Sequence, residues 1–543
     1  MSEPPSDFSE QEKRALAPYF TNLDRPVFAL RNLPEVVKAA LFARYSRSPK
    51  SLRRLFLDEF LGDQVVADVA SDVVVDGAAG STAAVGAERS ARLFKRVLSD
   101  YGDDSVAQLG GAHIAVEGAS NVLTKILEWG RLMAYLEQST RYIPYTTKTA
   151  GQWRYVVPDE VAGPLEARYR SCLDRVFETY ARWIDPAVSY FEERSPRGDD
   201  TSPTAYRATI RARALDALRG MLPAATRSNV GIFGSGQAFE MLVMRMRAHP
   251  LAEVRECAEA MLRELNEVIP AFLTRVDRPE RGGVWSGYLE ANRLGVAAVV
   301  AELWRGVAAD ECAAVALTDF DPRGEEKVVA AAMYAATSYP DDQLQARVRT
   351  MSDAEKTEVL RAYVGERRNR RHRPGRAFER TSYRFDVLAD YGAFRDLQRH
   401  RMLSLEWQQL SSQHGYVTPP AIAAIGADAD WHSLMAETAE VHAEMVAAGL
   451  REAASYVLPM AYRIRFYMEM NAREAMHVLE LRTTPQGHPA YRRVCQLMHD
   501  AIRDVAGHTA IAEAMIFVDH SGAEQGRLDA ERVGEAKRER DTG

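Results

Sequence analysis

The sequence predicts a helix-rich α+β protein built from two tandem copies of one domain. Three observations support this fold class. The chain has 543 residues, which exceeds the roughly 250–300 residues at which a single hydrophobic core stops growing. Segments with apolar residues at helical spacing are frequent, for example 251–268 and 432–461. Similar sequence blocks also recur in the same order in the two halves of the chain.

The repeat consists of paired blocks. These pairs are 38–55 with 329–346, 128–142 with 398–412, and 221–255 with 457–492. Between the first two blocks, Pro49 and Trp129 are 80 positions apart, whereas Pro340 and Arg399 are 59 apart. The difference of 21 is close to the length of segment 65–87, which is rich in Ala, Val and Gly. We therefore interpret that segment as an insertion in the first copy.

These blocks define the expected organisation of the chain. We predict a first repeat at 26–273 with an insertion at about 63–88, a linker region at 274–324, a second repeat at 325–522, and a charged flexible tail at 523–543. Helix dominates both repeats. The strand-like runs are short, at 155–157 and 514–518.

Composition excludes several classes of protein. Hydrophobic residues make up 46% and charged residues 27% of the chain, as in ordinary globular proteins. No apolar run of about 18 residues is present, so we expect no membrane span. The N-terminus has acidic residues and prolines where a secretory signal needs basic and apolar ones, so we expect a cytoplasmic protein. The four scattered cysteines predict neither a disulfide framework nor a metal site, and the net charge of −7 argues against general nucleic-acid binding.

The strongest local motif is Arg399-His400-Arg401, which we expect to precede an amphipathic helix. Guanidinium groups offer planar, bidentate donors that suit a phosphate or a ring with several carbonyl groups. Taken alone, the triplet favours the simpler interpretation, a surface cluster with solvated charges. The residues around the triplet are therefore needed to distinguish these interpretations.

With those residues included, the chain resembles the flavin-dependent thymidylate synthase family, also called thymidylate synthase complementing proteins. The family signature begins with Arg-His-Arg, two residues and Ser, and it ends with Glu, one residue, Ser, one residue and Arg-Tyr. The second repeat matches the beginning with Arg399, His400, Arg401 and Ser404. The first repeat matches the end with Glu137, Ser139, Arg141 and Tyr142.

A downstream block is divided between the repeats in the same way. The family has an Arg shortly before a Leu-Pro pair, and the first repeat keeps it as Arg219 whereas the second has Ser455. The family then has Asn-x-Arg, a second Asn and a late Arg. The second repeat keeps these positions as Asn471, Arg473, His477 and Arg482, with His in place of the second Asn. The two repeats have thus lost complementary parts of one motif set.

The resemblance implies an assembly and a single composite site. Members of the family are homotetramers whose active sites lie between subunits. Two repeats packed as a pseudo-dimer would therefore keep one active site, and a homodimer of the chain would form a pseudo-tetramer. The resemblance assigns the pyrimidine nucleotide to Glu137, Ser139, Arg141, Arg219, Arg399 and Arg482, with Ser139 and Arg399 as catalytic residues. It assigns FAD to His400, Arg401, Asn471, Arg473 and His477.

The implied activity is reductive methylation at C5 of dUMP or a related pyrimidine nucleotide, with FAD, methylenetetrahydrofolate and NADPH. Asp396 stands where the family has Gln, which would alter contacts with the pyrimidine or the folate. One alternative is a non-catalytic flavin- or nucleotide-binding regulator. Another is a nucleic-acid-binding protein that uses the basic run 367–376.

Individual residues also have simpler interpretations. Glu137 and Arg141 are four positions apart and could form an ordinary helical ion pair. Asn471 and Arg473 could be solvated helix residues, and His477 could be a packed or capping histidine.

Overall fold

The chain forms two compact units. In a computed structural model, the described residues are 8–33, 38, 41, 42, 45, 48–60, 110–198 and 202–522. Unit 1 comprises the described residues within Met1–Ala181, Leu222–Ala308 and Ala436–Leu458. Unit 2 comprises those within Arg182–Met221, Ala309–Met435 and Pro459–Gly543. Each unit therefore combines a sheet from one half of the chain with a helical segment from the other half.

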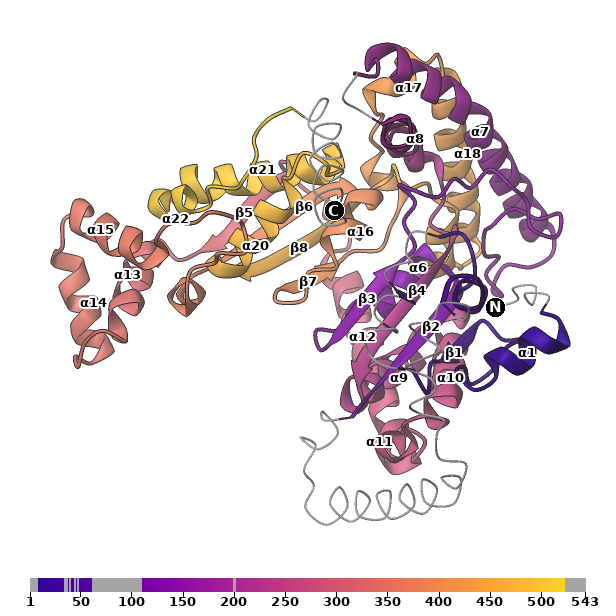
Figure 1. The fold of residues 1–543 in the computed structure, drawn as a ribbon, viewed down its shortest axis with the longest axis horizontal. Helices are drawn as coiled ribbons and strands as arrows, with labels where there is room; N and C mark the ends of the chain where they lie inside the picture. Colours follow the sequence, from indigo (N-terminus) through magenta and orange to yellow (C-terminus); the bar gives the residue numbers. More distant parts are fainter. Residues whose placement is uncertain are drawn as a thin grey trace. The chain divides into compact units, whose positions relative to one another are not determined.

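Unit 1 is built around a four-stranded antiparallel sheet in the order β1-β2-β4-β3 (Figure 1). Helix α10 packs against β1 and β2, and α9 packs against β4. The elements up to and including the second strand are α1 (Glu10–Leu16), β1 (Val27–Ala29), α3 (Leu52–Leu55), the π-helix η1 (Phe56–Phe60) and β2 (Gly111–Ser120). The next are α6 (Asn121–Leu127), β3 (Met133–Glu137), α7 (Pro164–Arg194), β4 (Arg227–Ser235), α9 (Gly236–Arg247), α10 (Ala252–Asn266) and α11 (Pro270–Leu273). The last are η4 (Pro279–Gly283), α12 (Val284–Leu303), α19 (Arg451–Ala454) and η7 (Ser455–Val457).

Unit 2 is built around a second antiparallel sheet, in the order β5-β6-β8-β7 (Figure 1). Helix α21 packs against β5 and β6, and α20 packs against β8. The elements up to the second sheet strand are α8 (Pro203–Leu218), η3 (Arg219–Met221), β5 (Val315–Phe320), α13 (Gly324–Tyr334), α14 (Asp341–Thr350), α15 (Asp353–Val364), η5 (Arg376–Arg380) and β6 (Ser382–Asp390). The others are α16 (Tyr391–Leu397), β7 (Ser404–Trp407), η6 (Ser412–His414), α17 (Pro420–Ala424), α18 (Asp428–Ala447), β8 (Arg463–Asn471), α20 (Ala472–Arg482), α21 (Pro489–Asp504) and α22 (Thr509–Ala514). Helices α7 and α18 contribute residues to both units.

The two sheets have the same strand order, and β3 pairs with β4 in the same register as β7 pairs with β8. The repeat blocks align Glu137 with Trp407 and Val230 with Phe466. Glu137 lies opposite Val230 in the first sheet, and Trp407 lies opposite Phe466 in the second. Such agreement between aligned sequence and strand pairing confirms the predicted tandem duplication and the helix-rich α+β class. The packing of the repeats as a pseudo-dimer stays a prediction.

Strand β2 contains a β-bulge that its counterpart β6 lacks in its pairing with β8. In β2, Glu117 and Gly118 together lie opposite Asn229, so the strand register shifts there. Gly118 has φ +73°, a conformation that glycine adopts without steric cost, and its N–H donates to Oδ1 of Asn229 at 2.9 Å. The bulge turns the Glu117 carboxylate into a buried cluster, where it accepts from the Tyr45 hydroxyl and the Leu52 backbone. The corresponding strand β6 pairs with β8 without interruption.

Helices that follow the strands begin in the same way in both repeats. Ser120 caps α6 and Asp390 caps α16, while Ser235 caps α9 and Asn471 caps α20. In each case a side-chain oxygen accepts from the backbone N–H three residues later, which satisfies one otherwise unpaired donor of the first turn. Repeated caps therefore fix the strand–helix junctions that carry several of the predicted site residues.

Several local predictions are corrected by the structure. The strand predicted at 155–157 is reduced to one isolated bridge between Tyr155 and Thr226, and 514–518 follows the end of α22. The segment 274–324, predicted as a linker, contains α12 and also β5, which is a strand of the second sheet. The predicted insertion at about 63–88 and the predicted tail at 523–543 lie outside the described residues. Within the described part of the chain, no helix is long and apolar enough to span a membrane.

Candidate functional site

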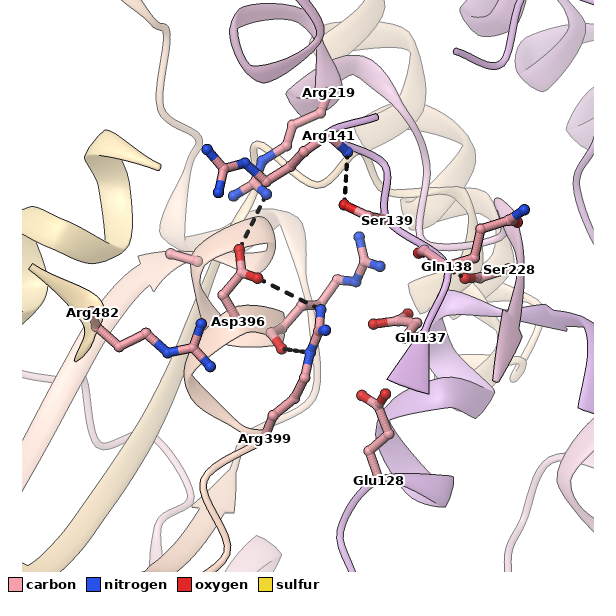
Figure 2. Close-up of polar contacts among 12 residues, drawn as sticks. Glu128, Glu137, Gln138, Ser139, Arg141, Arg219, Ser228, Asp396, Arg399 and Arg482 are labelled. Carbon is pink, nitrogen blue, oxygen red and sulfur yellow. Dashed lines mark hydrogen bonds and ion pairs between the residues drawn. The ribbon is translucent and has the colours of Figure 1, made fainter. Parts of the chain in front are cut away.

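Asp396 links two of the arginines predicted to bind the nucleotide. Arg219 begins η3 after α8, Asp396 lies in the last turn of α16, and Arg399 follows that helix. Asp396 Oδ2 accepts from Arg219 Nη1 at 3.2 Å, and its Oδ1 lies 3.5 Å from Arg399 Nη2 (Figure 2). Arg219 comes from the first repeat and the other two come from the second. Unit 2 therefore joins predicted site residues from both repeats through one carboxylate.

Arg219 is held in a confined position. Its side chain is only 4% exposed, so the guanidinium charge depends on the neighbouring carboxylates for stabilisation. A Cβ at Gly392 would lie 3.2 Å from Nη2 of Arg219 and 3.0 Å from Oδ1 of Asp390, so the glycine leaves room for both side chains. Among the described residues, Nη2 of Arg219 has no hydrogen-bond partner. The guanidinium thus has donor capacity that the protein itself does not use.

His400 and Arg482, predicted for the cofactor and the nucleotide respectively, are in direct contact. Arg482 Nε donates to His400 Nε2 at 2.8 Å, which requires an unprotonated acceptor nitrogen on the imidazole. Burial holds the pKa of His400 well below its usual range, and the nearby Arg482 acts in the same direction. His400 Nδ1 lies 3.8 Å from Glu474 Oε1. Because the ring is neutral, we interpret this second contact as a polar contact and not as an ion pair.

His477 and Glu474 lie one turn apart on α20 and complete this cluster. The rings of His400 and His477 are 5.5 Å apart, nearly edge to face. Burial lowers the pKa of His477 to about 4, with further lowering by Arg373 and Arg370. Burial also raises the pKa of Glu474 to about 7, against the effect of neighbouring arginines. Both imidazoles of the cluster are therefore held neutral, and guanidinium groups surround them.

The remaining predicted cofactor residues lie near this cluster in sequence. Asn471 is the N-cap of α20, where its Oδ1 accepts from the Glu474 backbone at 2.9 Å. Arg473 Nε donates to the Pro374 carbonyl, and its Nη1 lies 3.6 Å from the Glu379 carboxylate. Arg401 is exposed in the turn before β7. Asn471 therefore has a structural role, and Arg473 connects α20 to the end of the basic run.

The basic run 367–376 is not uniformly solvated. Arg367 is buried and donates through Nη1 and Nη2 to the Glu480 carboxylate, both at 2.6 Å. It also donates to the carbonyl of Ala514, so it anchors the run to α20 and α22. Arg370 and Arg373 act electrostatically on His477. The run therefore contributes positive charge around the histidine cluster.

Two groups of described residues have ligand atoms close enough together to bind a metal ion. They are His400, Glu474 and His477, and His499, Asp500 and His520. In the first group the surrounding arginines would repel a cation, because like charges in a buried environment interact strongly. The same arginines would attract an anion such as a diphosphate.

Unit 1 contains the other three predicted nucleotide residues. Glu137 ends β3 and is buried, and its Oε2 accepts from Lys125 Nζ at 3.2 Å. Lys125 also donates to Glu128 at 2.6 Å, so one ammonium group serves two carboxylates. Ser139 Oγ accepts from the Arg141 backbone at 3.2 Å (Figure 2), which leaves the serine hydroxyl hydrogen as a donor.

Local secondary structure at both motifs differs from the prediction. Glu137 is the last residue of a strand and Arg141 lies in the following turn, so the helical ion pair considered for them is wrong. Likewise, Arg399-His400-Arg401 precedes strand β7 and not an amphipathic helix. In β7 and β3 the cross-strand pairing with β8 and β4 overrides local helix propensity.

Sequence reasoning missed Glu474, Lys125 and Asp390. Glu474 and Lys125 looked like ordinary charged residues of amphipathic helices, and only their burial reveals their contacts. Asp390 is the N-cap of α16. The sequence signal for this role is an Asp directly before a short apolar segment.

Comparisons with known proteins agree on one family. The sequence model described as "thymidylate synthase complementing protein" matches residues 57–271 and 316–507. A UPF0159 protein of Chlamydia pneumoniae is 36% identical over 532 residues, which cover 97% of this chain and 98% of that protein. A UPF0159 protein of Thermoplasma acidophilum is 30% identical and covers 91% of this chain and 97% of its own length.

More distant similarities concern one part of the chain. A flavin-dependent thymidylate synthase of Mycobacterium sp. (strain KMS) is 30% identical over 182 residues, or 33% of this chain and 67% of that protein. A solved structure described as a UMP/dUMP methylase from Streptomyces cacaoi, bound with 5-Br dUMP, is 22% identical. It covers 37% of this chain and 94% of its own, with a TM-score of 0.29.

Proposed function

Because the chain belongs to the thymidylate synthase complementing protein family, we propose that it is a flavin-dependent, thymidylate-synthase-like methyltransferase. The proposed reaction is reductive methylation at C5 of dUMP or a related pyrimidine nucleotide. FAD is the bound cofactor, and methylenetetrahydrofolate and NADPH are the co-substrates. Relatives that share 30% identity with part of this chain carry the name flavin-dependent thymidylate synthase.

The observation that carries this proposal is the contact between repeats through Asp396. Arg219 and Arg399 approach the same carboxylate, although they lie 180 positions apart in the sequence. Random divergence of two copies would not keep one arginine in each repeat and bring both to one point. We infer that the two guanidinium groups bind the monophosphate and the base carbonyls of the nucleotide, together with Arg482.

We assign the rest of the nucleotide to residues of the first repeat. Arg141 contributes a further guanidinium group, and Ser139 offers a hydroxyl donor to the pyrimidine. Glu137 shares Lys125 with Glu128, so its carboxylate is held in one orientation within a buried ion cluster. Such pre-orientation lowers the entropic cost of arranging the reacting ring.

The donor set around α20 fits a flavin dinucleotide. His400 and His477 are neutral and buried, and Arg401, Arg473 and the basic run supply charge for a diphosphate. Asn471 keeps its side chain at the start of α20, where backbone N–H groups favour an anion. When bound, FAD supplies the hydride-transfer chemistry, and the protein residues bind and orient it.

A homodimer is part of the proposal, and α12 is the surface that we assign to it. No residue of this 20-residue helix is buried. Ten large apolar residues between positions 284 and 307 are exposed, including Leu294, Val299 and Leu303. Single exposed apolar residues are normal on a monomer, whereas this many along one segment mark an interaction surface.

The homodimer is tested by sedimentation velocity of the purified chain. Val299→Asp should convert the dimer to a monomer, because it places a charge within the apolar face. Val446→Asp, at an exposed valine outside α12, is the matched control and should leave the dimer intact. A wild-type chain that sediments as a monomer at micromolar concentration would contradict the assignment.

The activity is tested first by the visible absorbance of the purified chain, which should show bound flavin. Arg141→Ala, Arg219→Ala and Arg399→Ala should each abolish dUMP binding, whereas Arg131→Ala and Ser411→Ala should bind dUMP like wild type. Absence of flavin under every condition would remove the flavin from the proposal. Intact nucleotide binding in the Arg141 and Arg219 variants would remove the composite site. Flavin that binds but is not reduced by NADPH would favour the alternative, a non-catalytic flavin- or nucleotide-binding regulator.

A further inference from the structure

A cavity of about 470 Å³ lies within unit 2, outside the residues assigned to the flavin. Its wall combines residues of α8, α17, the first turn of α18 and the loop before α21. Most of the wall is apolar, with Phe191, Pro419, Trp431 and Met460 as large contributors. The volume lies within the roughly 300–1,000 Å³ that small-molecule sites occupy.

The internal repeat shows why this space exists. Extended by a few residues, the aligned blocks pair Gly220 with Tyr456, Ala490 with Glu253, and Asp390 with Ser120. In unit 1, Tyr456 is buried and its hydroxyl donates to Glu253 Oε2 at 2.5 Å.

Ser120 Oγ donates to the same Glu253 oxygen at 2.7 Å. A tyrosine ring and its hydroxyl thus close the corresponding region of unit 1.

In unit 2 the three matching residues cannot form that network. Gly220 has no side chain, Ala490 has no carboxylate, and Gly220, Ala490 and Asp390 all line the cavity. Trp431 takes up part of the space, because a Cβ at Gly220 would lie 2.8 Å from its ring. In unit 1 the carboxylate of this network belongs to Glu253, and Ser120 donates to it. In unit 2 the residue aligned with Ser120, Asp390, carries the carboxylate instead.

Asp390 provides a hydrogen-bond acceptor at this wall. Its Oδ1 accepts from the Ala393 backbone at 2.9 Å, as required of the N-cap of α16. The Asp390 side chain also lines the cavity. Burial raises the pKa of Asp390, although Arg219 acts in the opposite direction, and a more basic carboxylate is a better acceptor.

We propose that this cavity binds a planar aromatic ligand that carries a hydroxyl donor, with the ring against Trp431 and the hydroxyl donating to Asp390. The ligand would take the role that the Tyr456 side chain has in unit 1. The chemical class is therefore a phenol or a fused-ring equivalent. The cavity shares Arg219 with the proposed nucleotide site, but neither the nucleotide nor flavin is needed for the contacts with Trp431 and Asp390 that define the proposal.

The test uses the full chain and two probes of nearly equal shape, 2-naphthol and 2-methoxynaphthalene, in calorimetric titrations. The naphthol should bind saturably and at least about tenfold more tightly, because the ether cannot donate to a carboxylate. Asp390→Ser should abolish this preference while keeping the helix cap, since Ser120 caps α6 in unit 1. Equal binding of both probes, or an unchanged preference in the Asp390 variant, would overturn the proposal.

A second variant tests the location of the probe. Val417 lines the cavity and is 36% exposed, so Val417→Trp should fill the space without disturbing the core. It should remove saturable 2-naphthol binding, whereas Val446→Trp, at an exposed valine elsewhere, should not. Retained binding in the Val417 variant would place the probe outside the cavity and refute the assignment.

Discussion

Replacing Asp396 by Asn separates the structural role of this carboxylate from its role in the proposed site. Asn keeps the size and one acceptor oxygen but removes the negative charge between Arg219 and Arg399. We expect the variant to be less stable than wild type and yet to bind dUMP more tightly. Opposite changes in stability and affinity are the expected result for a carboxylate that competes with the nucleotide for two arginines.

The expected magnitudes follow from the contacts. Arg219 is 4% exposed and 3.2 Å from Asp396, so this charged hydrogen bond contributes about 1.5–3 kcal/mol. Arg399 is 31% exposed and 3.5 Å away, so its contribution is about 0–1 kcal/mol. The total of about 1.5–4 kcal/mol should lower the urea midpoint by roughly 1 M. A unit charge roughly 6 Å from a phosphate in a partly aqueous site corresponds to about tenfold in affinity.

Urea unfolding followed by circular dichroism measures the first effect, and calorimetric titration with dUMP measures the second. Asp386→Asn is the matched control, because Asp386 pairs with Arg465 on β6 and β8 in the same unit. It should lower stability slightly and leave dUMP affinity unchanged. Weaker dUMP binding in the Asp396 variant would refute the reasoning, since it would mean that the carboxylate contacts the ligand directly.

Three further substitutions test the described contacts. The pKa of Glu474 is raised to about 7, so the stability that this group contributes is complete below pH 4.5 and is lost as the pH rises through 7. Glu474→Gln should therefore raise the free energy of unfolding at pH 8, by on the order of 2–3 kcal/mol, but leave it unchanged at pH 4.5. Equal effects in urea unfolding at both pH values would contradict the raised pKa. Tyr456→Phe should destabilise the chain by about 1–3 kcal/mol in urea unfolding, because Glu253 loses a buried partner, and an unchanged midpoint would show that this hydrogen bond is dispensable. Gly118→Ala should reduce the free energy of unfolding by at least about 1 kcal/mol, because alanine is strained at φ +73°. Thermal unfolding measures this, and an unchanged thermal midpoint would mean that the bulge relaxes.

The repeat was predictable from sequence, whereas most of the sheet was not. Blocks of similar sequence in the same order require no knowledge of secondary structure. Strand β2 was missed because nine of its ten residues are buried, so it lacks the alternation that reveals a strand. Strand β8 does alternate, from Arg463 to Asn471, but its residues also suit a helix, and strand pairing decided the outcome.

For the candidate site, motif spacing identified the residues but not their partners. Spacing alone singled out Arg399 and Arg219 without showing that Asp396 joins them. The contact between Arg482 and His400 was equally invisible, since it joins a helix end to a turn 82 positions away. Contacts of this kind depend on tertiary packing, which sequence patterns within one repeat cannot report.

Comparison of the two repeats separates what the fold requires from what a ligand requires. At the junction before α6 and before α16, the fold needs only a side-chain oxygen that caps the helix, and Ser120 and Asp390 both supply it. The full negative charge of Asp390 exceeds that requirement. At the second junction, Ser235 and Asn471 cap equally well, so the cap does not explain why the residues differ. Positions where both repeats satisfy the same structural need with chemically different residues are therefore the first positions to test for ligand binding.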